Sequence, residues 1–187
     1  VILQAVNRLT GGDAARVAEI DEIGVFKTEQ AANCFKLLSK SGIPTAFVDQ
    51  HSGHELLCRN CDMLPIEFVV RRYAFGSYLK RAPQFKTDAK PHRFDELVLE
   101  QFHKMSVVAT PASDTPVIMT ENDARDQFLR DGEWAQGVYT DPFIVTGEDQ
   151  WQLYSAKAPV EGEALTAIKP ELSGDDLQTI LETIVRP

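Results

Sequence analysis

The order of apolar and polar positions predicts a strand and then a helix at the start of the chain. Residues 1–6, "VILQAV", form an almost unbroken apolar run and predict a buried strand. The helix that follows this strand is expected to end at Gly42 and Pro44, because both residues terminate helical structure. The face of that helix follows from apolar side chains at the i, i+3, i+4 and i+7 positions, which are Ala31, Cys34, Phe35 and Leu38.

Shorter apolar runs in the next stretch predict further strands. Residues 45–49 ("TAFVD") and 55–60 ("ELLCRN") flank the polar sequence "QHSGH" and predict a β-hairpin. Residues 64–70 ("LPIEFVV") predict a third strand. Residues 72–81 ("RYAFGSYLKR") have helical spacing, and Gly76 is the weakest position of the helix that this spacing predicts.

The middle of the chain carries a weaker pattern. Residues 82–118 are rich in Pro, Thr and Ser and poorly periodic, so they predict mostly loop around one short strand at 97–102. Thr120 and Asp123 are typical of a capped helix start, and that helix is expected to end near Gly132.

The last part of the chain predicts a strand pair and a helix. Residues 138–147 and 151–157 are the two expected strands. The final helix has one apolar face, formed by Leu177, Ile180, Leu181 and Ile184. Because strands come first and helices are expected to dominate later, the pattern favours the α+β class.

Composition narrows the class of protein. A chain of 187 residues suits one domain or two small lobes. No apolar run approaches the roughly 20 residues of a membrane helix, and no basic-plus-apolar leader is visible. The odd number of cysteines, three, argues against a disulfide framework and for a reducing compartment such as the cytoplasm. A net charge of −9 argues against nonspecific nucleic-acid binding, so any anion needs a local basic cluster.

One short segment provides such a cluster. Arg71, Arg72, Lys80 and Arg81 fall within eleven residues, and no acid lies among them. Neighbouring residues of a strand point to opposite faces, so at most one of the two adjacent arginines can share a pocket with Glu67. A solvated helix face is the alternative interpretation. The anion site is favoured, because an arginine beside a buried strand is costly without a partner.

Two other motifs carry less weight. The sequence "TGGDAAR" at 10–16 is Gly-rich, but it matches neither a dinucleotide-binding nor a P-loop pattern, and a tight turn with a polar surface explains it equally well. His51, His54, Cys58 and Cys61 include ligand types that zinc prefers, but their spacing fits no short zinc pattern. Cysteines three apart in a strand point to opposite faces, so buried thiols beside a hairpin turn are favoured.

Three stretches together resemble a known family. The sequence "CDMLPIEFVVRRYAFGSYLKR" at 61–81 is similar to the central signature of the SAICAR synthetase family. "NRLTGGDAAR" and "CFKLLSKSGIPTAFV" resemble two earlier family motifs in the same order, so the resemblance covers about residues 3–81. It implies a two-lobed α+β fold with an antiparallel sheet and flanking helices. The expected lobes are residues 1–61 and 62–187, and a homo-oligomer is compatible with the resemblance.

The resemblance also implies a reaction. Members of this family are ATP-dependent ligases of purine biosynthesis, which join the carboxylate of CAIR to the amine of L-aspartate and release SAICAR, ADP and phosphate. The implied partners are these small molecules and the implied cofactors are ATP and Mg²⁺, with no nucleic acid or membrane involved. All three substrates are anions, which fits an acid-free basic segment in an acidic protein.

Site residues follow from the resemblance by position. Asp13 and Arg71 are the implied catalytic residues, and Asp62, Met63 and Glu67 are the implied ATP-binding residues. No metal ligand is assigned. The implied substrate-binding residues are Thr10, Gly11, Gly12, Arg71, Ser77, Lys80 and Arg81.

The chain also departs from the family pattern. Asn7 and Ala14 stand where the family has Asp and Gly. The lysines of the family's opening "G-K-x-K-x-V-Y" hairpin and its late metal-binding acids have no counterpart between Val1 and Pro187. We therefore expect a piece of a longer enzyme. The alternatives are a shortened, non-catalytic relative that binds a phosphorylated nucleotide or a partner protein, and a distinct protein with a zinc-stabilised hairpin.

Overall fold

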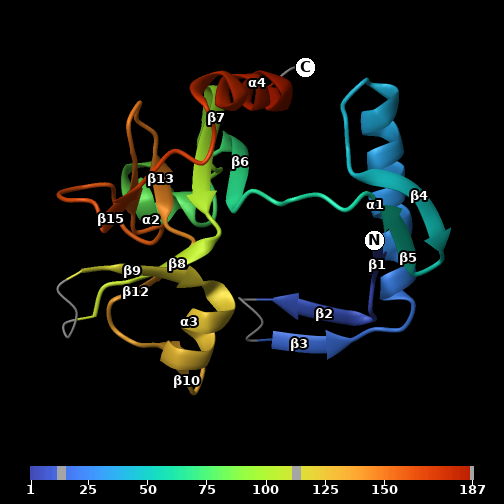
Figure 1. Cartoon of the computed structure of the whole chain (residues 1–187), viewed down its shortest axis with the longest axis horizontal. Helices are drawn as coiled ribbons and strands as arrows, with labels where there is room; N and C mark the ends of the chain where they lie inside the picture. Colours follow the sequence, from blue (N-terminus) through green and yellow to red (C-terminus); the bar gives the residue numbers. More distant parts are fainter. Residues whose placement is uncertain (12–15, 111–114, 186–187) are drawn as a thin grey trace. The chain divides into compact units, whose positions relative to one another are not determined.

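The chain folds into two compact units, Val1–Met63 and Leu64–Pro187 (Figure 1). This computed structural model describes residues 1–11, 16–110 and 115–185. Each unit has its own sheet and its own core, and each is described by itself below. The expected functional lobes at 1–61 and 62–187 stay a prediction.

The first unit is built on a three-stranded antiparallel sheet in the order β1–β5–β4. The edge strands are β1 (Ile2–Gln4) and β4 (Phe47–Ser52), and the central strand is β5 (Glu55–Cys58). The expected hairpin is confirmed, since β4 and β5 pair directly. β1 is not the buried strand that its apolar sequence predicts. Its residues are exposed at the edge of the sheet.

Helix α1 (Ile23–Lys40) packs against this sheet, and Figure 1 shows it beside β4 and β5. The expected helix is confirmed, but the expected face is partly wrong. Cys34 and Leu38 are exposed. The buried positions follow the i, i+4 spacing instead, at Gly24, Thr28 and Ala32.

Gly24 allows the start of α1 to approach the sheet closely. A Cβ atom at this position would lie 2.8 Å from the Ala5 carbonyl oxygen and 2.9 Å from Nδ1 of His54. The small face of the helix therefore defines the packing distance. A two-stranded ribbon completes the unit, formed by β2 (Arg8–Gly11) and β3 (Arg16–Glu19), whose residues are all exposed.

The second unit is built mainly from strands. Its larger sheet has five antiparallel strands in the order β15–β14–β13–β7–β6. Their bounds are Ile66–Tyr73 for β6, Arg93–His103 for β7, Phe143–Val145 for β13, Trp151–Tyr154 for β14 and Thr166–Ile168 for β15. The α+β class is confirmed, although helices do not dominate the later part of the chain as expected.

A smaller sheet, in the order β12–β8–β9, adjoins a short helix. Its strands are β8 (Met105–Val108), β9 (Val117–Thr120) and β12 (Val138–Thr140). The helix α3 (Glu121–Phe128) begins as expected, because the Thr120 hydroxyl accepts a hydrogen bond from the backbone N–H of Asp123. The predicted end near Gly132 is wrong. Gly132 lies in the turn between β10 (Leu129–Arg130) and β11 (Glu133–Trp134).

The expectation of mostly loop over 82–118 is wrong. Strand β7 alone has 11 residues and pairs with β6 along most of its length. Its apolar–polar alternation is hidden in the sequence, because the buried positions include Glu100 and His103. These polar side chains find partners only after the chain folds, so the hydrophobic pattern revealed only the part of β7 that was expected as a strand at 97–102, which is confirmed.

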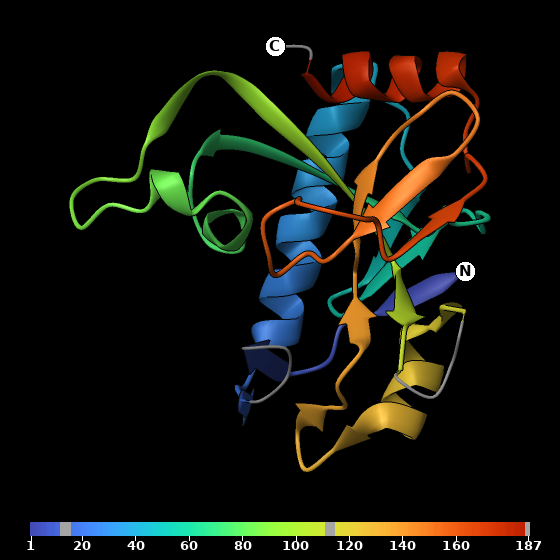
Figure 2. The same cartoon turned by 90° about the vertical axis from the view of Figure 1, so that its left-hand side faces the viewer.

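The helix expected over 72–81 is also mostly wrong. β6 continues through Tyr73, and α2 covers only Tyr78–Arg81. Between them the chain turns at Gly76, which has φ +60° and therefore a conformation that L side chains rarely adopt. A short 3₁₀ helix, η1 (Pro83–Phe85), follows α2. Figure 2 shows β6 and β7 as a long arm with α2 towards its end.

The expected strand at 138–147 is divided. β12 ends at Thr140 and pairs with β8, whereas β13 begins at Phe143 and pairs with β14. Asp141, between them, has a positive φ of 45°. The strand pair is therefore confirmed for its second half only.

The main core of the second unit combines residues of both sheets, with Val107 from β8 and the others from β13 and β14. It is formed by Val107, Ile144, Trp151 and Leu153. Helix α4 (Gly174–Val185) contributes Leu177 to this core, which agrees with the expected final helix. Among the described residues, no helix is long and apolar enough to cross a membrane.

Candidate functional site

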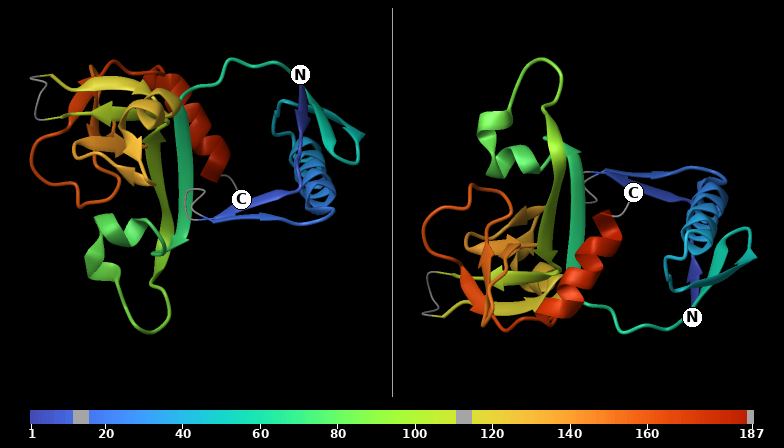
Figure 3. Two further views of the ribbon diagram at one scale, coloured as in Figure 1. Left: turned by 90° about the horizontal axis from the view of Figure 1, so that it is seen from below. Right: turned by 90° about the horizontal axis from the view of Figure 1, so that it is seen from above.

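The basic segment folds onto one face of the β6–β7 pair. Arg71 of β6 lies opposite Val98, and Glu100 of β7 lies opposite Val69, so the two charged residues are diagonal neighbours on the same face. Arg81 reaches this face from α2. Figure 3 shows the backbone of the long β6–β7 arm and the short helical segment that follows β6. The three side chains therefore meet although they are up to 29 residues apart in sequence.

Glu100 joins the two arginines. Its Oε2 atom accepts a hydrogen bond of 2.5 Å from Nε of Arg71. Its Oε1 atom accepts two from Arg81, 3.1 Å from Nε and 2.5 Å from Nη2. The exposed fractions of the side chains are 4% for Glu100, 5% for Arg81 and 17% for Arg71. This Arg71–Glu100–Arg81 triad is thus a nearly buried ion cluster with one excess positive charge.

Arg81 has hydrogen-bond partners and aromatic neighbours around its guanidinium. Its Nη1 atom donates a hydrogen bond of 2.7 Å to the carbonyl oxygen of Ala156. The rings of Phe102 and Phe143 lie 4.8 and 5.4 Å from its guanidinium carbon. Cation–π contacts of this kind are stronger in a site with little water. Arg81 is therefore held in one orientation.

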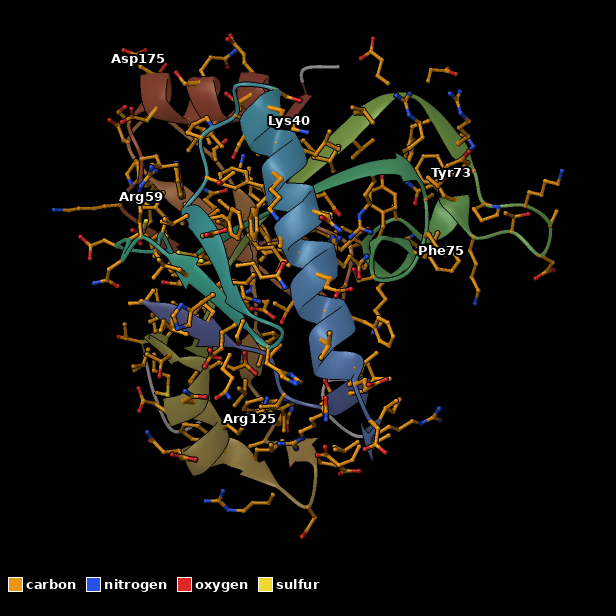
Figure 4. The ribbon with its side chains drawn as sticks, turned by 90° about the vertical axis from the view of Figure 1, so that its right-hand side faces the viewer. Lys40, Arg59, Tyr73, Phe75, Arg125 and Asp175 are labelled. Carbon is orange, nitrogen blue, oxygen red and sulfur yellow. The ribbon has the colours of Figure 1, made fainter. Side chains whose placement is uncertain are left out.

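Arg71 is the member of the triad that reaches the surface. Its Nη2 atom donates to the Ser77 hydroxyl at 3.2 Å, and its Nη1 atom donates to the Phe75 carbonyl at 3.4 Å. Figure 4 places Phe75 in the turn that follows the end of β6 at Tyr73. The turn at Gly76 brings the hydroxyl back to the guanidinium. A guanidinium beside a hydroxyl can bind phosphate or carboxylate oxygens.

A pocket adjoins the triad within the second unit. Its volume is about 390 Å³, and its lining includes Arg81, Glu100, Tyr78, Phe143 and residues 159–161. The pocket lies beside Arg81 and Glu100, and Arg71 is not among the residues that line it.

The other predicted substrate-binding residues have simpler surroundings. Lys80 is exposed in α2. Thr10 and Gly11 are exposed at the end of β2, in the first unit. Gly12 and Asp13 lie outside the described residues. The roles of these residues, and a joint site of Thr10 and Gly11 with Arg71, stay predictions.

Arg72 has a separate environment, as the strand geometry predicts. Its Nη1 atom donates to the Asp95 carbonyl rather than to the triad. It is therefore a natural control for substitutions of Arg71 and Arg81.

The three predicted ATP-binding residues are exposed. Asp62 and Met63 end the first unit, and Glu67 lies near the start of β6. Glu67 interacts with Lys104, whose Nζ atom lies 3.3 Å from its Oε2 and 2.8 Å from Oδ1 of Asp141. The partner that Arg71 finds is Glu100 rather than Glu67, although Glu67 shares its strand face.

The Lys104 environment favours its charged form. Burial by itself lowers the pKa of this ammonium group, but hydrogen bonds and charge from Asp141 and Glu67 outweigh burial and raise the pKa above its ordinary value of 10.5. A group with a raised folded-state pKa stabilises the fold fully below its unfolded pKa and loses that effect as pH rises through the folded value.

We expect Lys104→Met to destabilise the second unit by less than about 1 kcal/mol, since the Lys104 side chain is 42% exposed and its ion pairs are screened by water. The difference in unfolding free energy from the natural protein should stay constant between about pH 7 and 9 and shrink above about pH 10.5. Urea unfolding at several pH values measures this. A steady decline of the difference between about pH 7 and 9 would contradict the assignment.

Two members of the site were not predicted. Glu100 lies in the segment "LVLEQF" that was expected to be a short strand, and a single acid within an apolar run is the only signal in the sequence that could have indicated it. The Ala156 carbonyl has no signal in the sequence, because every residue has a backbone carbonyl oxygen.

No metal centre is formed by the described residues. No three His, Cys, Asp or Glu side chains converge among them, and this holds for His51, His54, Cys58 and Cys61. Cys34, Cys58 and Cys61 are free thiols. The residues that the structure describes therefore form no site that fits Mg²⁺, and no step through a metal ion is derived from them.

Comparisons with known proteins agree with the motif resemblance. A phosphoribosylaminoimidazole-succinocarboxamide synthase of Chloroflexus aurantiacus is 40% identical over 103 residues, which are 55% of this chain and 40% of that protein. The match thus spans less than half of the relative's length. Among solved structures, a type-2 SAICAR synthetase in complex with ADP has 29% identity and a TM-score of 0.50, covering 55% of this chain and 42% of that one.

A type-1 SAICAR synthetase from Pyrococcus horikoshii covers 98% of this chain and 92% of its own, at 18% identity and a TM-score of 0.50, and so supports the fold alone. The SAICAR synthetase family model matches residues 1–127, well over half of the chain. The chain therefore belongs to the SAICAR synthetase family.

Proposed function

We propose that this chain is part of an ATP-dependent ligase that joins CAIR and L-aspartate to form SAICAR, ADP and phosphate. The observation that carries the proposal is the Arg71–Glu100–Arg81 triad with its excess positive charge, in a member of a family whose relatives have this activity in their names. A solved relative is described as a complex with ADP, which supports a nucleotide as one ligand.

The proposed chemistry activates a carboxylate. An oxygen of the CAIR carboxylate attacks the terminal phosphorus of ATP, and ADP leaves. The amine of aspartate then attacks the activated carbonyl carbon, so that an amide forms, phosphate leaves and the amine gives up a proton. Each step moves anions towards one another, so cationic side chains fixed in advance lower its barrier. Mg²⁺ would act on the phosphates of ATP, and this chain's described residues are given no part in holding it.

The proposed roles of the residues follow from the family resemblance, and for Arg71 and Ser77 the local geometry supports them. Arg71 and Ser77 would hold the phosphate or carboxylate of CAIR, because a guanidinium and a hydroxyl already lie together there. Lys80 would add positive charge nearby. Thr10, Gly11, Gly12 and Asp13 would line the CAIR and aspartate site, with Asp13 and Arg71 in catalytic roles. Asp62, Met63 and Glu67 would contact ATP. The proposed compartment is the cytoplasm, where purine precursors are made.

Arg71→Ala tests the proposal. We expect this substitution to weaken CAIR binding by roughly 1.5–3 kcal/mol or more, about tenfold to a few hundredfold, because a charged hydrogen bond to the ligand is lost. Calorimetric titration with CAIR, and separately with Mg-ATP, measures the effect.

Arg72→Ala is the matched control, since Arg72 is the adjacent arginine and hydrogen-bonds the Asp95 carbonyl instead of the triad. Its CAIR affinity should stay within about twofold of the natural protein. Unchanged CAIR affinity in Arg71→Ala would remove Arg71 from the site. No CAIR binding by the natural chain would contradict the proposed acceptor site itself.

A further inference from the structure

We propose that Arg81 and Glu100 are positioning residues, which set the orientation and the net charge of Arg71 at the anion site. The inference deepens the proposed function, since it rests on Arg71 binding an anionic ligand. It assigns Arg81 a different role from direct substrate contact. It also brings the Ala156 carbonyl into the site, from a segment beyond the family-matched residues 1–127.

The first argument is the division of the Glu100 carboxylate. One oxygen accepts from Arg71 and the other accepts twice from Arg81. Because each oxygen of Glu100 accepts hydrogen bonds from one arginine only, Arg71 contacts the carboxylate through its Nε atom and the oxygen Oε2. That contact leaves the Nη1 and Nη2 side of Arg71 directed to the Phe75 carbonyl and the Ser77 hydroxyl. The orientation of Arg71 thus depends on where Arg81 holds the carboxylate.

The second argument is charge. With both arginines present, one carboxylate is shared between two cations, so the triad keeps one excess positive charge. Without Arg81, Arg71 and Glu100 form a neutral pair, and Arg71 attracts an anion less. Coulomb interactions over such distances are substantial where little water intervenes, and Glu100 and Arg81 are 4% and 5% exposed. Arg81 is therefore expected to control anion affinity without contacting the anion.

The third argument is the enclosure of Arg81. Its Nε and Nη2 atoms donate to Glu100, its Nη1 atom donates to Ala156, and the rings of Phe102 and Phe143 have their centroids 4.8 and 5.4 Å from its guanidinium carbon. These contacts use three of the five N–H bonds of Arg81, and its side chain is only 5% exposed, so a ligand has little access to the remaining two. A ligand that binds Arg71 needs no such displacement, since its two outer hydrogen bonds lie at the surface.

A double-mutant cycle tests the inference, with inorganic phosphate and CAIR as separate probes. Arg81→Met keeps the length of the side-chain stem but removes the charge and the hydrogen-bond donors. We expect it to weaken phosphate binding about tenfold to a hundredfold. Adding Glu100→Gln in the double variant removes the carboxylate that would neutralise Arg71. Binding should then recover to within about threefold of the natural protein, because the side-chain oxygen of Gln can still accept the hydrogen bond from Nε of Arg71 and keep its orientation.

A purely structural role predicts a different result. In that case the two substitutions would add, and the double variant would bind phosphate no better than Arg81→Met. Direct contact of Arg81 with the ligand also predicts no recovery. Either result overturns the inference. A phosphate affinity of Arg81→Met equal to that of the natural protein would overturn it too. Arg72→Met is the control and should change binding less than about twofold, because Arg72 hydrogen-bonds the Asp95 carbonyl instead of the triad.

Thermal unfolding of each variant shows whether the second unit remains folded. Phosphorus NMR and calorimetry measure the binding of inorganic phosphate and of CAIR. Recovery in the cycle with phosphate, but no CAIR binding by the natural chain, would keep the positioning roles and reject the proposed substrate. CAIR binding without recovery would keep the substrate and reject the positioning roles. A natural chain that binds neither probe would reject both.

Discussion

Glu100→Gln is expected to lower the free energy of unfolding of the second unit by about 3–5 kcal/mol, because it leaves two nearly buried guanidinium groups without their shared counter-ion. The neutral amide can accept hydrogen bonds through one oxygen only. Its nitrogen is a donor and would face the donors of Arg71 or Arg81. The exposed fractions of 4%, 5% and 17% for Glu100, Arg81 and Arg71 mean that water compensates this loss poorly.

Urea unfolding followed by tryptophan fluorescence measures the stability of the second unit, since both tryptophans, Trp134 and Trp151, belong to it. Glu96→Gln is the matched control, because Glu96 is an exposed acid on the same strand. Its effect should stay within about 0.5 kcal/mol. A loss below about 1 kcal/mol in Glu100→Gln would mean that the two arginines find other partners, and the triad would not be a structural unit.

Leu153→Ala is expected to cost about 3 kcal/mol, within the 2–5 kcal/mol range for a buried leucine. Leu153 is 0% exposed and lies in β14, opposite Ile144 of β13 and Thr166 of β15. Removing its isobutyl group loses the transfer free energy of the buried carbons and leaves a cavity beside Trp151, another member of the same core cluster.

Val145→Ala is the control for this substitution. Val145 belongs to the neighbouring strand β13 but is 37% exposed, so its truncation should cost less than about 1 kcal/mol. Unfolding in urea measures both variants, and the fluorescence of Trp151 reports on the core directly. Equal losses for Leu153→Ala and Val145→Ala would show that Leu153 does not lie at the centre of the packing.

Local signals in the sequence predicted several elements correctly. The capping interaction of Thr120 with Asp123 depends on residues three apart, and the hairpin of β4 and β5 depends on a short polar turn between two apolar runs. Such features need no partner from elsewhere in the chain. Helix α1 was predicted for the same reason, but its buried face was partly wrong, because Gly24 and Thr28 pack against the sheet although neither is a large apolar residue.

Features that depend on distant partners were missed. Only residues 97–102 of strand β7 were expected to form a strand, since its buried positions include Glu100 and His103, and a charged side chain is not expected in a core until its partners are known. The helix expected over 72–81 was shortened for a related reason. Pairing with β7 extends β6 as far as Tyr73, and a pattern read within a single segment contains no information about that pairing.

The sequence by itself determined the family, the α+β class and the segment from Cys61 to Arg81 as the place of a basic cluster, because these follow from motifs and charges that are contiguous along the chain. Only the tertiary structure decided how the cluster is organised. It pairs Arg71 with Glu100 rather than with Glu67, and it encloses Arg81 beneath the Ala156 carbonyl. The physical reason is that a buried charge is stable only beside a counter-charge, and strand pairing determines which counter-charge that is.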